Sequence, residues 1–197
     1  MENKNFSCAC IIMASGQGKR FGSNKLMADF LGEPLIAGIL KVTENIFARR
    51  VIVTRHRDVE NLCKSLGLEV VLHDKPHRND TVRLGLEALE KNYTHYAFCM
   101  GDQPLVKKSS LERLLNKAQA EPKYIWRLAY EEIQGTPVIF PAKFFEELSA
   151  LPEAKGGGYL LKKYADKVRT VSVNEAYELL DIDTQEDLQK LLQIKEQ

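Results

Sequence analysis

The stretch Cys8-Ala-Cys-Ile-Ile-Met-Ala-Ser-Gly-Gln-Gly-Lys-Arg-Phe-Gly-Ser-Asn-Lys25 joins an apolar, strand-like run to a glycine-rich, basic loop. Glycines let the backbone bend and approach a ligand closely, and cations add positive charge where main-chain N–H groups can point at an anion. The loop contains Gly16, Gly18, Gly22, Lys19, Arg20 and Lys25. The sequence therefore predicts a phosphate cradle at the end of a β-strand, and a polyanionic ligand.

The spacing of this loop differs from that of two familiar phosphate-binding loops. A P-loop needs a lysine and then a serine or threonine directly after its last glycine, whereas Gly22 is followed by Ser23. The dinucleotide fingerprint Gly-x-Gly-x-x-Gly is missed by one residue, because three residues separate Gly18 from Gly22. The spacing excludes a P-loop NTPase. A Rossmann oxidoreductase and a plain strand-to-helix loop with solvated lysines remain alternatives.

Composition bounds the class of protein. The 197 residues suffice for one sizeable α/β domain and are too few for two. Lysine and arginine number 28 against 27 acidic residues, so phosphate binding has to come from local clustering of charge. No apolar stretch reaches the roughly 20 residues of a membrane span, and Met1–Phe6 lacks the features of a signal peptide. We therefore expect a cytoplasmic protein with no nucleic-acid or membrane partner.

Cysteine and histidine spacing gives no metal or redox motif. The cysteines stand mostly in apolar runs and form no Cys-x-x-Cys pair, so we expect reduced thiols in or near the core. They are Cys8, Cys10, Cys63 and Cys99. His73 and His77 are close in sequence, but Pro76 breaks the intervening helix, which disfavours a metal site there.

Apolar runs alternate with amphipathic helical patterns, which predicts an α/β domain with a mostly parallel central sheet between two helical layers. In residues 1–120 the predicted strands are 8–14, 50–54, 68–72 and 95–100, and the predicted helices are 34–47, 58–66, 80–91 and 109–120. We expect Asp58 to cap the second of these helices and Asp80 or Thr81 to begin the third.

The second half of the chain is less regular. Residues 121–180 contain predicted strands at 124–130, 135–140 and 168–173 and a short helix at 144–148, which we interpret as an insertion or lid beside the main sheet. A C-terminal helix follows within 184–197. Thr184 and Asp187 resemble a capping box at its start. We expect all these segments to form one domain.

Two aspartates each follow an apolar element and precede a helix. Asp102 lies just past the predicted strand 95–100, where open α/β sheets bind ligands, and Asp183 stands before the last helix. Mg²⁺ takes one or two carboxylates and completes its shell with water and phosphate oxygens, so the pair predicts a magnesium site. A β-turn at Asp102, and favourable charge at a helix N-terminus for Asp181 and Asp183, are the structural alternatives.

Three motifs in this order resemble the MobA-like nucleotidyltransferases, and within them the molybdenum cofactor cytidylyltransferase (MocA-type) branch. Residues 13–26 are similar to the signature loop, Gly101-Asp-Gln-Pro-Leu105 to the metal motif, and Asp181-Ile-Asp-Thr-x-Glu-Asp-Leu188 to the C-terminal motif. Between them, Thr81-Val-Arg-Leu-Gly85 resembles the start of the base-side helix. Gly135-Thr-Pro137 and Lys155-Gly-Gly-Gly158 stand where the acceptor-side segments occur, so the resemblance spans nearly the whole chain.

The resemblance implies a Rossmann-like nucleotidyltransferase (GT-A-like) fold, with an NTP-binding half at about 1–120 and an acceptor-binding half at about 121–180. It also implies transfer of CMP from CTP, or of another nucleotide, to a molybdopterin-type molybdenum cofactor with release of pyrophosphate. Arg20 and Lys25 would be the catalytic groups, and Mg²⁺ on Asp102 and Asp183 would neutralise the phosphates.

The residues that the resemblance assigns to binding fall into two sets. The nucleotide-binding set is Met13, Ala14, Ser15, Gly16, Gly18, Lys19, Asp80, Thr81 and Gly85. The acceptor-binding set is Gly135, Thr136, Pro137, Gly156 and Gly157. Ser15 puts a hydroxyl beside the nucleotide and is the first residue to examine for the choice of base.

Besides the oxidoreductase, two other functions remain open. The acceptor can be another phosphate ester, such as a sugar phosphate, a methylerythritol phosphate or a cobinamide-type phosphate. The protein can also be a nucleotide-binding chaperone for cofactor insertion that does not turn over. Transient contact with a molybdoenzyme or its maturation factor is a further expectation.

Overall fold

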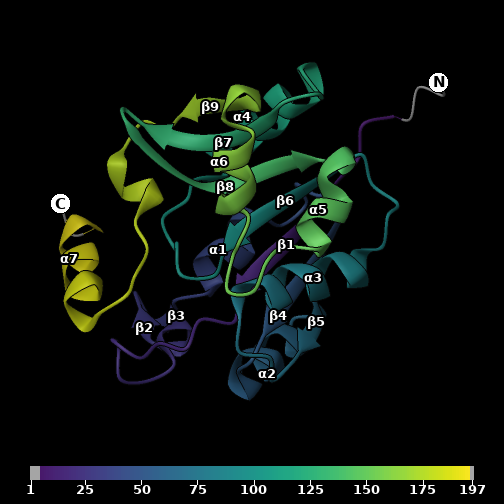
Figure 1. The fold of residues 1–197 in the computed structure, drawn as a ribbon. Coiled ribbons are helices and arrows are strands. Elements are labelled where there is room, and N and C mark those ends of the chain that lie inside the picture. The colour runs from purple at the N-terminus through teal and green to yellow at the C-terminus, as the bar shows by residue number, and fades with distance from the viewer. Residues whose placement is uncertain (1–4, 196–197) are drawn as a thin grey trace.

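The computed structural model describes residues 5–195, and its centre is a single sheet in the order β5-β4-β1-β6-β8-β7-β9 (Figure 1). The strands are β1 (Cys8–Ala14), β4 (Arg49–Thr54), β5 (Glu69–Leu72), β6 (His95–Met100), β7 (Ile125–Tyr130), β8 (Ile133–Pro141) and β9 (Val168–Ser172). All pairings are parallel except those of β8 with β6 and β7. The predicted mostly parallel sheet is therefore confirmed.

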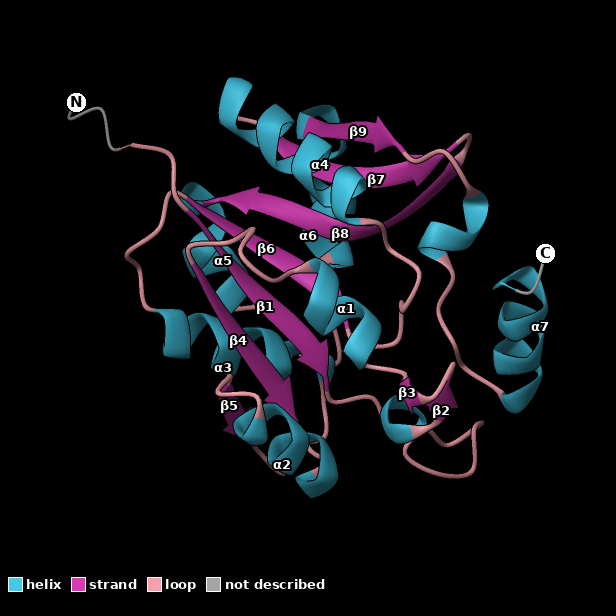
Figure 2. Ribbon diagram, turned by 180° about the vertical axis from the view of Figure 1, so that it is seen from behind, coloured by secondary structure: helices cyan, strands magenta, loops and turns pink. Residues whose placement is uncertain are grey.

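Helices cover both faces of this sheet (Figure 2). One face packs against α1 (Ala37–Val42), α2 (Arg57–Ser65) and α4 (Lys108–Ala120). The other packs against α3 (Arg78–Leu89), α5 (Phe145–Ser149) and α6 (Gly158–Lys163). The chain thus forms the predicted three-layer α/β fold.

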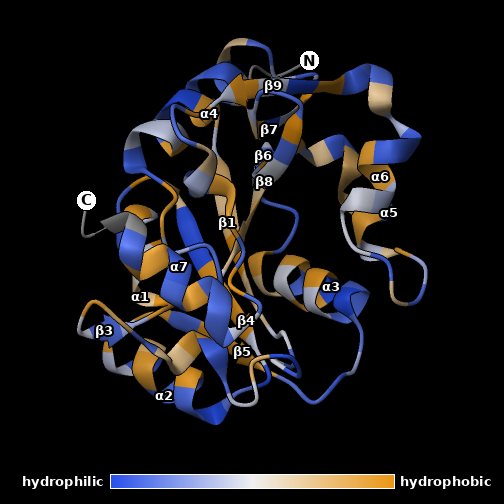
Figure 3. Ribbon diagram, turned by 90° about the vertical axis from the view of Figure 1, so that its left-hand side faces the viewer, coloured by the Kyte–Doolittle hydropathy of each residue, from blue (hydrophilic) through white to orange (hydrophobic). Residues whose placement is uncertain are grey.

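The apolar run at the start of the chain is buried on both sides. All seven residues of β1 are buried, and Figure 3 shows this strand in hydrophobic colours between helices of mixed colour. Cys8 and Cys10 face the α1, α2 and α4 layer, while Ile11 faces α3. The four cysteines are buried and free, as expected, and burial raises the pKa of the Cys63 thiol to about 11. These thiols are core side chains.

The second half does not form an insertion or lid beside the sheet, and that prediction is wrong. β8 pairs with β6 from His95–Pro141 to Phe98–Val138, and β7 and β9 then extend the same sheet. The reason is that β8 is buried on both faces from residue 137 to residue 141, as a central strand requires. Of the two segments predicted to bind the acceptor, residues 135–137 therefore lie in the same sheet as β1, whereas residues 155–158 lie outside the sheet, at the start of α6.

Three helix boundaries also differ from the predictions. α1 covers only Ala37–Val42, because Pro34 belongs to the short hairpin of β2 (Asp29–Phe30) and β3 (Glu33–Pro34). α2 begins at Arg57, so Asp58 lies in its first turn and is not its N-cap. α3 begins at Arg78, two residues before the predicted start.

The C-terminal helix α7 (Gln185–Lys195) lies apart from the central sheet in both ribbon views and packs beside the glycine loop. Its Leu188 and Leu191 share a small core with Phe21. The predicted capping box is confirmed: the amide of Asp187 donates to Thr184 Oγ1 at 3.1 Å, and the amide of Thr184 donates to Asp187 Oδ2 at 2.8 Å. Within residues 5–195 no helix is both long and apolar enough to cross a bilayer.

Candidate active site

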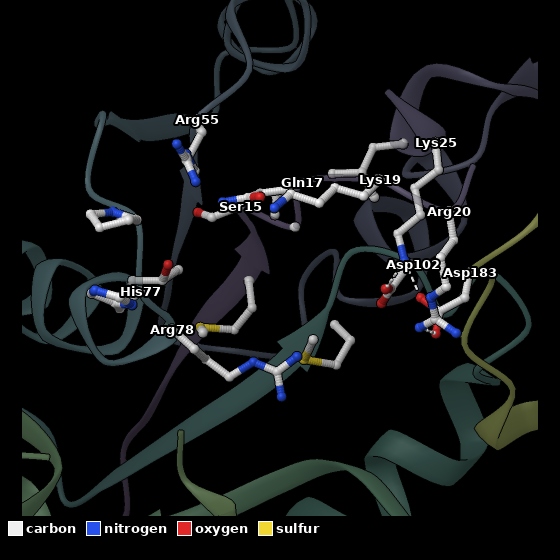
Figure 4. Close-up of a pocket in the computed structure, with 18 of the residues that line it drawn as sticks. Ser15, Gln17, Lys19, Arg20, Lys25, Arg55, His77, Arg78, Asp102 and Asp183 are labelled. Atoms are coloured by element: carbon white, nitrogen blue, oxygen red, sulfur yellow. Dashed lines mark hydrogen bonds and ion pairs between the residues drawn. The ribbon is translucent and has the colours of Figure 1, made fainter. Parts of the chain in front are cut away.

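A pocket of about 350 Å³ lies at the carboxyl ends of β1 and β6, where the glycine loop, the loop before α3 and the segment before α7 converge (Figure 4). Its lining includes six lysine and arginine side chains and two aspartates, so it is strongly positive although the whole chain is nearly neutral. The predicted residues that line it are Met13, Ala14, Ser15, Gly16, Gly18, Lys19, Arg20, Lys25, Thr81, Asp102 and Asp183.

One end of the pocket, which we call the carboxylate end, consists of Arg20, Lys25, Asp102 and Asp183. Lys25 Nζ donates to Asp102 Oδ2 at 2.7 Å and to Asp183 Oδ1 at 2.8 Å. Arg20 Nη2 donates to the other oxygen of Asp183 at 2.5 Å. The Lys25 side chain is only 8% exposed and that of Asp102 14%, whereas Arg20 is 71% exposed. Residues up to 163 positions apart therefore form one ion-pair network.

The charges of this network shift one another's pKa values. Burial acts to lower the pKa of Lys25, but the Asp102 and Asp183 carboxylates outweigh it and raise that pKa. Hydrogen bonding from Lys25, with the charge of Arg20, lowers the pKa of Asp183. Burial and the charges of Asp102 and Asp183 raise the pKa of Asp181 to about 6. Lys25 and Asp183 therefore stay ionised at neutral pH.

The glycine loop has a fixed shape for two reasons. Gly18 has a φ of +59°, and a Cβ there would lie 2.5 Å from the carbonyl oxygen of Ser23, so only glycine fits. The carbonyl of Gly18 accepts from the amides of Phe21 at 2.9 Å and Gly22 at 3.1 Å, which closes the turn. The buried ring of Phe21 anchors it. The loop is thus preorganised around the pocket.

Ser15 does line the pocket, but its hydroxyl is already engaged. Its Oγ donates to the carbonyl of Val53 at 2.9 Å and lies 2.8 Å from Nε2 of His73. Because the hydroxyl proton goes to Val53, the ring of His73 must donate to Ser15, and His73 Nδ1 then accepts from the amide of Lys75 at 3.1 Å. This hydroxyl holds the loop before α3 in place.

The other end of the pocket, which we call the basic end, consists of Arg55, Lys75, His77 and Arg78. In Figure 4 the side chains of Arg55 and His77 lie on the side away from Asp102 and Asp183. Arg55 follows β4, and the other three precede or begin α3. None of the four was predicted from the sequence, although the dense basic run in residues 75–78 before a helix was a usable signal.

Comparison with known proteins identifies the family. The sequence profile of the MobA-like NTP transferase domain matches residues 10–168. The chain belongs to this family. MobA-like proteins are thus its relatives, and the protein is by family an NTP transferase with the Rossmann-like nucleotidyltransferase fold.

Individual relatives agree with this assignment. A probable molybdenum cofactor guanylyltransferase of Aquifex aeolicus is 25% identical over 94% of this chain and 90% of its own. A 3-deoxy-manno-octulosonate cytidylyltransferase of Neisseria gonorrhoeae is 29% identical over 45% of this chain and 37% of its own. Rv0371c of Mycobacterium tuberculosis, a solved structure, has a TM-score of 0.83 at 23% identity and covers 95% of this chain and 98% of its own; it has also been solved in complex with manganese.

The carboxylate end of this MobA-like chain fits a divalent cation. Asp102 Oδ1 is buried and has no hydrogen-bond partner in residues 5–195, and Asp183 lies across Lys25 from it. The described residues contain no cluster of three or more ligating side chains, but Mg²⁺ needs only one or two carboxylates when phosphate oxygens and water complete its shell. Asp102 and Asp183 are therefore the residues that would hold it.

The predicted acceptor residues lie outside this pocket, and several have local partners. Thr136 donates from Oγ1 to the buried Gln103 at 2.6 Å, and the carbonyl of Gly135 accepts from Arg127. Gly156 lies against Arg78, where a Cβ would be 2.6 Å from Cδ of that arginine. The acceptor-side segments thus touch both Gln103, beside Asp102, and the basic end. Gly157 packs against Phe140.

Two predicted nucleotide-binding residues also lie away from the pocket lining. The Asp80 carboxylate accepts from the amide of His77 at 3.3 Å and from Arg83, so it caps α3. Gly85 packs on β1, where a Cβ would lie 2.6 Å from the side chain of Ile11. Their positions give them structural roles in seating α3. His73 and His77 contact Ser15 and Glu153 instead of each other.

Proposed function

We propose that this protein transfers CMP from CTP to a phosphorylated molybdopterin-type cofactor and releases pyrophosphate, with Mg²⁺ as the metal. The observation that carries the proposal is Lys25, which is buried between Asp102 and Asp183 at one end of a pocket bounded by the glycine loop. A fixed cation and two carboxylates beside a polyphosphate cradle are what attack on an α-phosphorus needs. The manganese complex of Rv0371c supports a divalent metal.

The chemistry of the step assigns a role to each side chain. An oxygen of the acceptor phosphate forms a bond to the α-phosphorus, the bond to the bridging oxygen of the β-phosphate breaks, and pyrophosphate leaves with that electron pair. The acceptor is already anionic at neutral pH, so no general base is required. Lys25 stabilises the charge that develops on the α-phosphate oxygens, and the exposed Arg20 binds the leaving phosphates. Bound Mg²⁺ supplies Lewis-acid neutralisation of the phosphates.

Guanylyl transfer is the second candidate. It is supported by the Aquifex relative, which is named a probable molybdenum cofactor guanylyltransferase and matches nearly the whole chain. The two candidates share the metal, the acceptor and the carboxylate end, and differ only in the base. A different phosphorylated acceptor and a non-catalytic chaperone are further outcomes of the test below. The cytoplasmic location and contact with a molybdoenzyme or its maturation factor stay predictions.

Pyrophosphate release tests the proposal directly. The purified protein is incubated with each of the four NTPs, with and without Mg²⁺ and molybdopterin-type cofactor. Release is expected only with CTP, Mg²⁺ and cofactor together; release with GTP instead would favour the guanylyl alternative. Asp102→Asn is expected to lower turnover by about 100-fold or more, because the substitution removes the negative charge of the buried residue that would bind the metal. Tight NTP binding with no pyrophosphate release in the presence of any acceptor, and with the same affinity in Asp102→Asn, would overturn the proposal in favour of the chaperone.

A further inference from the structure

Arg55 lines the pocket and forms no ion pair with any acidic residue in the part of the chain that the structure describes. Its Nη1 is buried and has no hydrogen-bond partner within residues 5–195. Leaving a buried donor without a hydrogen-bond partner is energetically costly, so such groups are rare unless a ligand, an ion or water completes them. The positive charge of Arg55 also contributes to lowering the pKa of His73, after burial, which places the guanidinium near that ring.

The residues on both sides of Arg55 are tied by their side chains to the end of β1 and to the glycine loop. Thr54 Oγ1 donates to the carbonyl of Ala14 at 2.9 Å, and the ring of His56 donates from Nε2 to the carbonyl of Gly16 at 2.7 Å. Arg55 therefore projects from a segment that is fixed on one side to the end of β1 and on the other to the glycine loop. A donor held in this way can discriminate between ligands, because little entropy is lost on binding.

Arg55 lies on the side of the pocket away from Asp102 and Asp183 (Figure 4). If the α-phosphate lies at Lys25 and the remaining phosphates lie along the glycine loop, then the base extends toward the basic end, where Arg55 lines the pocket. Ser15 is the nearest alternative reader, but its hydroxyl donates to Val53 and accepts from His73. This step rests on the function proposed above.

We propose that Arg55 is the residue that selects the base, and that it favours a nucleotide whose base presents two adjacent hydrogen-bond acceptors. A guanidinium offers two parallel N–H donors in a rigid fork. Cytosine matches the fork with O2 and N3, and guanine with O6 and N7. Uracil has an N–H donor between its two carbonyl oxygens. In adenine, N1 and N7 each lie next to the exocyclic amino group, which is a donor. Neither base therefore offers the fork two adjacent acceptors. The substrate class is therefore CTP or GTP, and UTP and ATP are disfavoured.

Binding of nucleotides by the full chain tests this inference. Dissociation constants of CTP, GTP, UTP, ATP and inorganic tripolyphosphate are measured calorimetrically with Mg²⁺ for the wild type, Arg55→Met, Arg55→Lys and Arg57→Met. Arg57 is the matched control, because it is two residues away, 79% exposed, paired with Glu60 and outside the pocket lining. Arg55→Lys keeps the charge but removes the fork, so it separates base reading from simple electrostatics.

The expected result has three parts. The wild type binds CTP or GTP about 10- to 100-fold more tightly than UTP and ATP, as a bidentate base contact allows. Arg55→Met and Arg55→Lys lose this preference while their affinity for tripolyphosphate stays within about twofold of the wild type. Arg57→Met keeps the preference. The thermal unfolding temperature of each variant, measured alongside, shows that it is folded.

Three different results would overturn the inference. If Arg55→Met weakens all four NTPs and tripolyphosphate equally, Arg55 is a phosphate anchor. If the wild type prefers UTP or ATP, or if Arg55→Lys keeps the wild-type preference, Arg55 does not read the base. In each case, release of pyrophosphate from CTP by the wild type would still leave the proposed function standing. A wild type that binds none of the NTPs would instead refute the proposed function, and this inference with it.

Discussion

The two ends of the pocket carry charge in opposite ways. At the carboxylate end every cation has an acidic partner, with Lys25 between Asp102 and Asp183 and Arg20 on Asp183. At the basic end Lys75, Arg78 and Arg55 line the pocket with no acidic residue among the described lining residues beside them. His77 pairs with Glu153, which is 79% exposed. One end is neutralised before any ligand binds, and the other is not.

This difference in charge pairing suits the carboxylate end to catalysis and the basic end to ligand binding. Paired and buried charges are held in one geometry, so they can respond to charge that develops during a reaction without reorganising first. Cations without acidic partners instead gain most when a polar or anionic ligand arrives, which makes them binding groups. The comparison predicts that substitutions at the carboxylate end change turnover, while those at the basic end change affinity and selectivity.

The largest expected effect is that of Lys25→Ala. The variant removes the cation to which the proposed function assigns stabilisation of the transition state, so we expect kcat to fall by about 100- to 1,000-fold while the dissociation constant of the NTP rises by less than about tenfold. Stopped-flow binding and steady-state pyrophosphate release measure the two quantities. The control is Lys64→Ala, because Lys64 is 61% exposed and pairs with Glu60 on α2. Equal losses of kcat and affinity would show that Lys25 only anchors ground-state phosphate.

The carboxylate end was predictable from the sequence, whereas the basic end was not. Residues 13–25, Asp102 and Asp183 carry their chemistry in short motifs next to apolar runs, and a motif is local information. Arg55 is one arginine after one strand. Its role arises only because the sheet order puts β4 beside β1, and no periodicity encodes that order.

The fold shows the same division. The β/α alternation of residues 1–120 predicted its layers, because each strand there is a short apolar run between helices. β8 was placed beside the sheet rather than in it, since antiparallel pairing with a strand about 40 residues earlier leaves no local pattern. The partner that engages Ser15, His73, is 58 residues away and was equally invisible.

Thr184→Ala is expected to have an intermediate effect, on stability. It tests how firmly the N-cap of α7 holds the segment that carries Asp183. The variant loses the bond from the amide of Asp187, and Asp187 in turn holds the amide of Asp183 at 3.1 Å. We expect the free energy of unfolding to fall by about 1 kcal/mol, as for other lost N-caps. Urea titration measures it. Thr184→Ser restores the hydroxyl and should recover most of the loss; no recovery would mean that the methyl group matters more than the cap.

Gly156→Ala tests the contact between the acceptor-side segment and the basic end. The new Cβ would lie 2.6 Å from Cδ of Arg78, so this side chain must leave its rotamer. A displacement of that kind costs about 0.5–1.5 kcal/mol, and we expect the KM for the nucleotide to rise about 2- to 10-fold with kcat little changed. Gly158→Ala is the matched control, because nothing lies within 4 Å of a Cβ there. A KM that changes equally in both variants would remove Arg78 from nucleotide binding.

The smallest effect concerns pH and the unpaired charge of Arg55. Burial, then the charge of Arg55, lowers the pKa of His73, although Asp80 and Asp74 act to raise it. His73 is therefore neutral in the folded protein, whereas the unfolded chain protonates it near pH 6.5. The contribution of His73 to the free energy of unfolding is fully present above that pH and is lost as the pH falls toward the lowered pKa.

Urea unfolding between pH 7.5 and 5 measures this loss. His73→Gln should show a shallower decline than the wild type, although His95, whose pKa burial also lowers, keeps part of the slope in both proteins. Arg55→Met should flatten the decline in the same direction, because the pKa of His73 rises when the neighbouring cation is removed. If stability declines with pH in both variants as steeply as in the wild type, the basic end does not act on His73. The charge of Arg55 is then screened by solvent before any ligand arrives.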